Sequence, residues 1–124
     1  MKYMIMMFGE AATMRETKSP EWIEGMMKFM GALYQELSEA GELVFAEGLV
    51  DGSQAKTVRF QNGIPVATDG PFAEAKESLV GFWMVDVESE ARALEIASKI
   101  VKTIEEPVEV RRVGDAPPEP SPDL

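Results

Sequence analysis

The chain contains neither cysteine nor histidine among its 124 residues. Without these side chains it cannot form disulfides, thiolate nucleophiles, Cys–His zinc sites or a Ser–His–Asp triad, and it has no imidazole for acid–base chemistry. Basic residues are also few: Lys and Arg total 12 against 22 Asp and Glu, which gives a net charge of −10. Because a surface of this sign repels phosphate backbones, we expect no nucleic-acid binding.

Long apolar runs are missing as well, and no segment approaches the roughly 20 residues that a membrane helix needs. The apolar run in residues 1–8 is short, and Gly9 and Glu10 interrupt it before a signal peptide could form. We therefore expect a cytoplasmic protein that contacts no membrane. With 45% hydrophobic and 27% charged residues, the composition is that of an ordinary globular protein.

The composition changes near residue 114. Residues 114–124 hold four of the eight prolines and three acidic side chains, which is typical of an extended, solvated segment. The preceding part of the chain has the apolar spacing of packed helices and strands. The sequence thus predicts one domain over residues 1–113 and a proline-rich acidic tail over residues 114–124.

Two helices are predicted from their capping residues and apolar spacing. Ser19 before Pro20 is a typical helix start, and Gly41 is a typical stop. The apolar side chains between them recur at helical spacing and are expected to face inward: Trp22, Met26, Phe29, Leu33 and Leu37. Ser89 is predicted to cap a second helix that ends near Lys102. Its expected inward side chains are Leu94, Ala97 and Val101.

Apolar runs bounded by turn residues predict six strands. They span residues 2–8, 43–50, 55–61, 64–68, 80–87 and 107–113. The pairs Asp51-Gly52 and Asn62-Gly63 are typical hairpin turns, so the second, third and fourth strands are expected to pair in sequence order. The polar residues 10–18 are expected to form a loop.

This order of elements predicts an α+β protein, a ferredoxin-like sandwich with both helices on one face of the sheet. Residues 2–8 and 80–87 are apolar at both alternating sets of positions, yet helices would cover only one face. Because a large exposed apolar sheet is unfavourable in water, a second copy is expected to cover the other face. The pattern therefore predicts a homodimer.

The most distinctive motif is Asp-Gly-Pro-Phe-Ala-Glu-Ala-Lys-Glu at residues 69–77. It resembles the signature of the DGPF group of YciI-like, or YCII-related, proteins. The likeness extends over nearly all of residues 1–113 and includes the segments Glu47-Gly48-Leu49, Gly81-Phe82 and Val108-Glu109-Val110-Arg111. The resemblance implies a ferredoxin-like fold that dimerises as an α+β barrel, with a cleft between the sheet and the motif loop.

The resemblance implies no single reaction, because most DGPF proteins have no established one. Some relatives are associated with extracytoplasmic-function sigma factors, and a few YciI-like relatives are thought to act on small halogenated or lactone-like aromatics. The relatives credited with chemistry tend to carry a His–Asp pair. This chain lacks histidine, so that pair cannot be transferred to it.

Asp69 is the candidate catalytic residue of the motif. A carboxylate held before Gly70 and Pro71 on a rigid loop would act as a general base if partial burial raised its pKa. Alternatively, it accepts hydrogen bonds from its own turn, as Asx residues do. Phe72 is expected to form either a pocket wall or an apolar peg that holds the loop.

Charged residues are the other candidates for ligand binding. Lys76 would hold a substrate carboxylate, or pair with Glu74 or Asp69 in a solvated run of charges. Glu47 interrupts an apolar strand face, and a buried carboxylate needs a cation. Arg59 on the strand expected beside it is the predicted partner, in a pair that is either structural or part of a ligand cleft.

The nine methionines raise the possibility of Cu(I), which binds thioethers well. Their positions in a predicted helix and a predicted buried strand are better explained by adaptable core packing, so we expect no metal and no cofactor. Two functions remain open. One is an enzyme that uses Asp69 for proton transfer on a small organic acid or aromatic compound, and the other is a non-catalytic ligand-binding or regulatory module with a protein partner.

Overall fold

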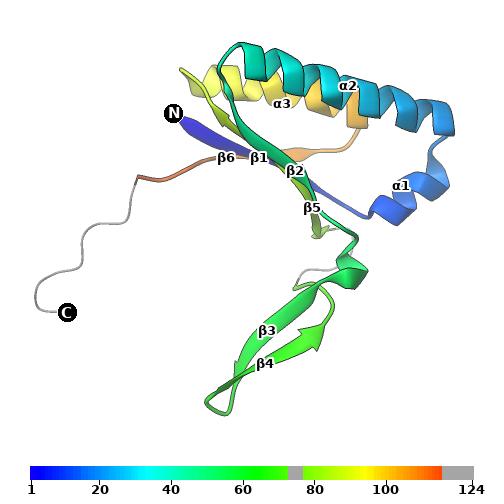
Figure 1. The fold of residues 1–124 in the computed structure, drawn as a ribbon, viewed down its shortest axis with the longest axis vertical. Coiled ribbons are helices and arrows are strands. Elements are labelled where there is room, and N and C mark those ends of the chain that lie inside the picture. Colours follow the sequence, from blue (N-terminus) through cyan, green and yellow to red (C-terminus); the bar gives the residue numbers. More distant parts are fainter. Residues whose placement is uncertain (73–76, 116–124) are drawn as a thin grey trace, which may run out of the picture.

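The computed structural model describes residues 1–72 and 77–115 of the chain. Two predicted ligand contacts, Glu74 and Lys76, lie outside the described residues, as does the tail from residue 116 onward. The described elements, in chain order, are β1 (Lys2–Phe8), α1 (Ala11–Thr17), α2 (Pro20–Glu39), β2 (Leu43–Gly48), η1 (Gly52–Gln54), β3 (Lys56–Gln61), β4 (Ile64–Asp69), β5 (Leu79–Asp86), α3 (Glu90–Ile104) and β6 (Val108–Arg112) (Figure 1).

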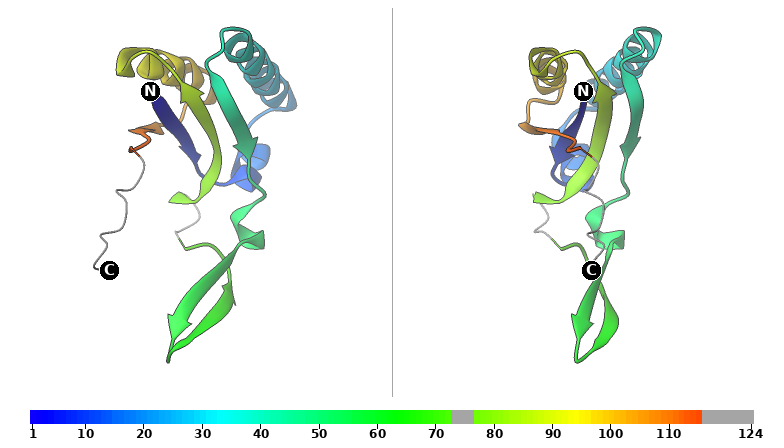
Figure 2. Two further views of the ribbon diagram at one scale, coloured as in Figure 1. Left: turned by 60° about the vertical axis from the view of Figure 1, so that its left-hand side comes forward. Right: turned by 90° about the vertical axis from the view of Figure 1, so that its left-hand side faces the viewer.

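Four strands form an antiparallel sheet in the order β2-β5-β1-β6. Helices α2 and α3 pack on one face of this sheet, and the β3–β4 hairpin projects from the body (Figure 2). The fold is therefore α+β, as predicted, and it is compatible with a ferredoxin-like arrangement. None of the helices in the described part of the chain combines the length and apolar character needed to cross a bilayer.

The core lies between the sheet and the helices α2 and α3. Alternating residues of β1 and β5 turn toward the helices, and they are buried: Tyr3, Ile5, Trp83 and Val85. The helices meet them with another buried set: Leu33 and Leu37 from α2, and Ala93, Ile96, Ala97 and Ile100 from α3. Each buried aliphatic side chain contributes roughly 1.5–3 kcal/mol relative to an exposed one.

Both predicted helix starts are confirmed, since Ser19 Oγ accepts from the Trp22 N–H at 3.0 Å and Ser89 Oγ from the Arg92 N–H at 3.2 Å. The predicted inner face of α3 is partly wrong, because Leu94 is 49% exposed. The stripe at i, i+3, i+4 and i+7 that meets the sheet begins one residue earlier, at Ala93. Both stripes contain Ala97, so sequence spacing alone did not separate them.

Residues 10–18 were expected to form a loop, but Ala11–Thr17 is the helix α1. So short a helix cannot be stable by itself, and two turns give too little periodicity to predict one. A hydrogen bond stabilises its first turn: the Thr13 hydroxyl donates to Glu10 Oε2 at 2.6 Å.

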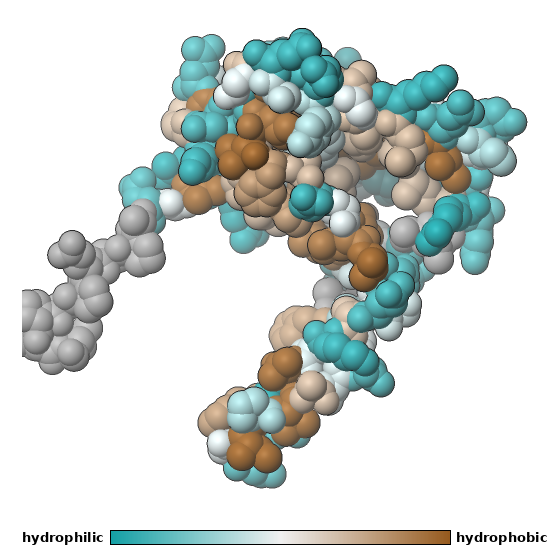
Figure 3. Space-filling model, viewed as in Figure 1, coloured by the Kyte–Doolittle hydropathy of each residue, from teal (hydrophilic) through white to brown (hydrophobic). Residues whose placement is uncertain are grey.

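The hairpin predicted at Asp51-Gly52 is also wrong. Asp51 caps η1 by accepting from the Ser53 N–H at 3.1 Å, and β2 pairs with the central strand β5 instead of β3. The second predicted hairpin is confirmed. Asn62 and Gly63, with φ of 50° and 82°, provide the left-handed turn between β3 and β4. Apolar side chains are exposed along this hairpin (Figure 3).

Candidate functional site

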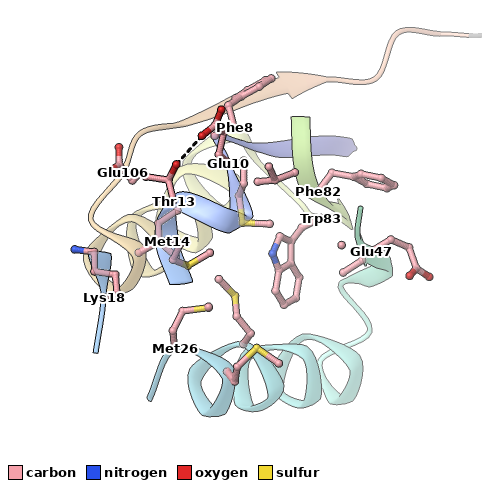
Figure 4. A pocket seen from close by; sticks show the side chains of 18 of the residues that line it. Phe8, Glu10, Thr13, Met14, Lys18, Met26, Glu47, Phe82, Trp83 and Glu106 are labelled. Carbon is pink, nitrogen blue, oxygen red and sulfur yellow. Dashed lines mark hydrogen bonds between the residues drawn. The ribbon is translucent and has the colours of Figure 1, made fainter. Parts of the chain in front are cut away.

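A cavity of about 970 Å³ opens between the end of the sheet and helices α1 and α2. Its volume lies in the upper part of the range for small-molecule sites. Its walls are mainly apolar (Figure 4). They include five methionines and five aromatic side chains: Met7, Met14, Met26, Met27, Met30, Phe8, Trp22, Tyr34, Phe82 and Trp83. Thioether side chains adapt to ligands of different shape.

The length of α2 creates this cavity. The helix has 20 residues, which corresponds to about 30 Å, and its N-terminal half extends past the sheet toward α1 (Figure 1). Leu33 and Leu37 in the C-terminal half therefore enter the core, whereas Trp22 and Met26 in the N-terminal half line the cavity, and Met30 at the middle of the helix contacts both. The apolar stripe of α2 therefore contacts the core along one part of the helix and lines the cavity along the other.

Trp83 supplies the polar group of the inner wall. Its side chain comes from β5, is only 4% exposed, and turns its indole nitrogen toward the cavity (Figure 4). Buried indole N–H groups usually have an acceptor, but no described residue accepts a hydrogen bond from this one. Since no side-chain nitrogen of the described residues is sealed from solvent without a partner, the N–H group opens to the cavity.

One side of the cavity has a charged rim. Lys18, Glu10 and Glu106 lie there together with Thr13 (Figure 4). The Lys18 ammonium is 3.4 Å from Glu105 Oε2 and 4.8 Å from the centre of the Trp22 ring. This rim can hold the polar end of a molecule whose apolar part lies among the methionines.

Asp69 does not line this cavity. Asp69 ends β4, its side chain is 88% exposed, and it forms an ion pair with Lys56. The partial burial that a general base at Asp69 would need is therefore not seen in the single chain, and within the described residues the carboxylate accepts from Lys56 and not from its own turn. The following Gly70 is tied to β3 instead, because its N–H donates to Ala55 O at 2.9 Å and its carbonyl accepts from Thr57 Oγ1 at 2.7 Å.

The other predicted site residues are also dispersed. Phe72 is 82% exposed and lies 5.4 Å from the guanidinium carbon of Arg59, so within its own chain it is neither a pocket wall nor a buried peg. Glu47 does border the cavity, but its carboxylate points away from it, on the same side as Phe82 (Figure 4). The predicted Glu47–Arg59 pair is wrong for a single chain, because β3 does not lie beside β2.

Among the described residues, the groups with a shifted pKa lie outside the cavity lining. The hydrogen bond from Arg92 lowers the pKa of Glu42, and the same contact raises that of Arg92. Hydrogen bonds from Ser53 lower the pKa of Asp51. The Arg92–Glu42 pair joins α3 to the start of β2, with Nη2–Oε1 at 2.8 Å and Nε–Oε2 at 2.9 Å, and its role is structural.

Sequence reasoning missed the residues that make this site. Trp22 and Met26 were assigned to the core from their helical spacing, and Trp83 lies in a strand that is apolar on both faces. A usable signal was the grouping of Trp22 with three methionines within nine residues of one helix: Met26, Met27 and Met30.

Comparison with known proteins gives two matches. A model of the YCII-related domain matches residues 1–116. An uncharacterized protein of Rhizobium meliloti (strain 1021) is 39% identical over 79 residues, and this match covers 64% of the present chain and 64% of that protein. The chain thus matches less than two thirds of the length of this relative. Neither description states an activity.

Proposed function

This chain belongs to the YCII-related domain family, and from that premise we propose that it is a small-molecule-binding protein. The ligand is a mainly apolar molecule with a hydrogen-bond acceptor. The observation that carries the proposal is the indole N–H of Trp83, which opens from an otherwise buried side chain to a large apolar cavity and has no acceptor among the described residues. A ligand that fills the cavity displaces solvent from this donor, and a donor left without a partner is costly, so the N–H favours a ligand with an oxygen that accepts from it.

The walls define the class of ligand. Methionines and aromatic rings favour a flat or branched hydrocarbon body. The indole N–H of Trp83 favours an oxygen acceptor at the end of the ligand that reaches the inner wall of the cavity. The rim carries both Lys18 and Glu10, which suits a second polar group. These features support an aromatic or lactone-like compound with a carbonyl, ester or carboxylate oxygen.

The cavity favours binding over proton transfer. Of the acidic side chains that line it, Glu10 accepts a hydrogen bond from Thr13, Glu47 turns its carboxylate away from the cavity, and Glu106 lies at the rim. A catalytic carboxylate must touch its substrate, whereas Asp69 is exposed and paired with Lys56. The enzymatic role of Asp69 and the link to a protein partner such as a sigma factor stay predictions.

The functional unit that we propose is a homodimer. Each chain contributes its single domain, residues 1–113, and the two domains together form an α+β barrel. The sheet face turned away from the helices carries a group of partly exposed apolar side chains: Met4, Met6, Phe45, Phe82 and Met84. Phe45 and Phe82 meet edge to face with ring centres 5.7 Å apart. Burial of this face between two copies would remove it from water.

Intrinsic fluorescence tests the binding proposal directly. The chain has two tryptophans, Trp22 and Trp83, and both line the cavity. Titration with a panel of aromatic carboxylic acids, lactones and phenols is expected to change this emission saturably for at least one class. At a concentration one hundred times its dissociation constant, the same compound should add about 2.7 kcal/mol to the free energy of unfolding. The melting temperature should rise accordingly. A panel in which no compound does either would overturn the proposal.

A further inference from the structure

The cavity wall is rich in methionine, a side chain that hydrogen peroxide oxidises. Five of the nine methionines of the chain line the cavity. A cysteine thiolate would compete for the same oxidant, but the chain has no cysteine. A peroxide that reaches the cavity therefore reacts with a thioether, which becomes a methionine sulfoxide.

Met27 is the cavity methionine that is most open to solvent. It is 63% exposed. The other four cavity methionines are only partly exposed: Met7, Met14, Met26 and Met30. Of the methionines outside the cavity, Met1 is the most exposed, at 52%. A dissolved oxidant therefore meets the sulfur of Met27 before that of any other cavity methionine.

Met27 also borders the space that a ligand would occupy. Helix α2 forms one wall of the cavity (Figure 4), and Met27, Gly31 and Tyr34 line it together. Their spacing of four and three residues places them in one row along the helix. Gly31 has no side chain, and a Cβ built there would meet no atom within 4 Å. This row therefore has open space beside Met27, where a ligand can contact the thioether.

Oxidation changes what this side chain offers to a ligand. The sulfur attacks one oxygen of hydrogen peroxide, an S–O bond forms as the O–O bond breaks, and the second oxygen leaves with both protons as water. Sulfur loses two electrons and the peroxide gains them. The product is a polar sulfoxide, whose oxygen accepts hydrogen bonds from water. The apolar part of a ligand that covers this oxygen supplies no donor, and an acceptor left without a partner is costly.

We propose that Met27 is an oxidation site that regulates the cavity, and that its conversion to the sulfoxide by hydrogen peroxide weakens ligand binding. The inference rests on the proposed binding function and adds a control to it. The net charge of −10 repels an anionic oxidant such as hypochlorite, which favours the neutral peroxide. The step is reversible, because a thiol-dependent sulfoxide reductase removes the oxygen as water while two thiols become a disulfide.

Peroxide treatment followed by peptide mapping tests the site. Mass spectrometry is expected to find added oxygen on Met27 before it finds any on Met14 or Met26. Once Met27 is oxidised, calorimetric titration with a compound that the untreated protein binds should show an affinity about tenfold lower. Sulfoxide reductase with dithiothreitol should restore the affinity. Circular dichroism before and after oxidation confirms that the protein stays folded.

Met27→Leu isolates the role of this sulfur, because leucine is apolar and of similar volume but carries no thioether. Each variant is compared with itself before and after peroxide treatment. The loss of affinity should be absent in Met27→Leu. It should persist in Met84→Leu, the matched control, because Met84 does not line the cavity.

Met27→Gln tests the effect of polarity without an oxidant. A polar amide at this position should weaken binding of the same compound. Lys28→Gln is its control, since Lys28 is the next residue of α2, has a side chain that is 79% exposed and does not line the cavity. This control should bind as the wild type does.

The outcomes separate the two proposals. A compound that binds equally well before and after oxidation of Met27 would refute the regulation and leave the binding proposal standing. An equal loss of affinity in Met27→Leu would refute the regulation as well, since another methionine would then be responsible. If no compound binds the untreated protein, both proposals fail.

Discussion

The rings of Tyr34 and Trp83 lie 6.4 Å apart and are tilted by 54°, and this contact joins α2 to β5 at the inner wall of the cavity. Tyr34 is about half exposed, whereas Trp83 is buried. The contact and the core around β5 restrict rotation of the indole ring, so its N–H group is held toward the cavity. A donor that is fixed in advance binds an acceptor at a lower entropic cost.

Filling the cavity is expected to abolish ligand binding. Gly31 lies on the cavity wall in the middle of α2, and a new Cβ there meets no atom within 4 Å. Gly31→Leu therefore places a side chain in the ligand's space without a backbone clash. Titration by tryptophan fluorescence should show that this variant no longer binds the compound that the wild type binds.

Gly25→Leu is the matched control for Gly31→Leu. Gly25 is in the same helix, is exposed, has equal room for a Cβ and does not line the cavity. Removing either glycine from the helix should add up to about 1 kcal/mol of stability. Binding lost in both variants, or kept in both, would contradict the assignment of the cavity.

The ion pair between Glu42 and Arg92 predicts that the free energy of unfolding decreases at acidic pH, a decrease that we call the acid limb. Because the pKa of Glu42 lies below its ordinary value of 4.5, the pair adds stability above that value, and this stability is lost as the pH falls through the folded pKa. Glu42→Gln should cost on the order of 1 kcal/mol at neutral pH and flatten the dependence below about pH 4.5. Urea unfolding between pH 3 and 7 measures both effects.

Glu95→Gln is the control for that experiment, because Glu95 also contacts Arg92, at 2.8 Å, but is 61% exposed. An exposed pair of this kind contributes roughly 0–1 kcal/mol. If Glu95→Gln changes the acid limb as much as Glu42→Gln does, the partly buried contact is not its source.

The inner face of α3 is tested by two truncations of similar size. Ile96 is fully buried against the sheet, whereas Leu94 is half exposed. Ile96→Ala is expected to cost about 2–5 kcal/mol of unfolding free energy, and Leu94→Ala should cost less than about 1 kcal/mol. A larger loss in Leu94→Ala than in Ile96→Ala would favour the inner face predicted from the sequence.

Asp69→Asn separates anchoring of the β3–β4 hairpin from catalysis. Since Asp69 is exposed and paired with Lys56, its replacement should change the unfolding free energy by less than about 1 kcal/mol and leave ligand affinity in the cavity unchanged. Should a turnover assay with the bound compound reveal a reaction whose rate loses its acid limb in Asp69→Asn, the proton-transfer hypothesis would replace the binding proposal.

The elements that short-range chemistry determines were predictable from the sequence. Ser19 and Ser89 start their helices through hydrogen bonds within three residues, and Asn62-Gly63 closes a hairpin by its own backbone preference. Family membership was predictable from the motif at residues 69–77. Each of these features depends on neighbours in the chain.

The features that depend on distant residues were not predictable. The pairing of β2 with β5, which places Glu47 beside Phe82, competes with a local Asp-Gly turn and prevails because β5 is the central apolar strand. The cavity arises because α2 extends past the sheet, and sequence spacing cannot distinguish a methionine that faces a cavity from one that faces a core. The position of Trp83 at the cavity wall could therefore not be predicted from the sequence.

The most direct test of the central claim is the indole N–H resonance of Trp83 in a protein labelled with nitrogen-15. The two tryptophans give two indole signals, which Trp22→Phe assigns. Saturation with the binding compound should move the Trp83 signal downfield, as a new hydrogen bond to an oxygen does. In Trp83→Phe, which keeps an aromatic ring at this position but removes the donor, affinity should fall up to about tenfold. A compound that occupies the cavity while the Trp83 signal stays in place would contradict the account.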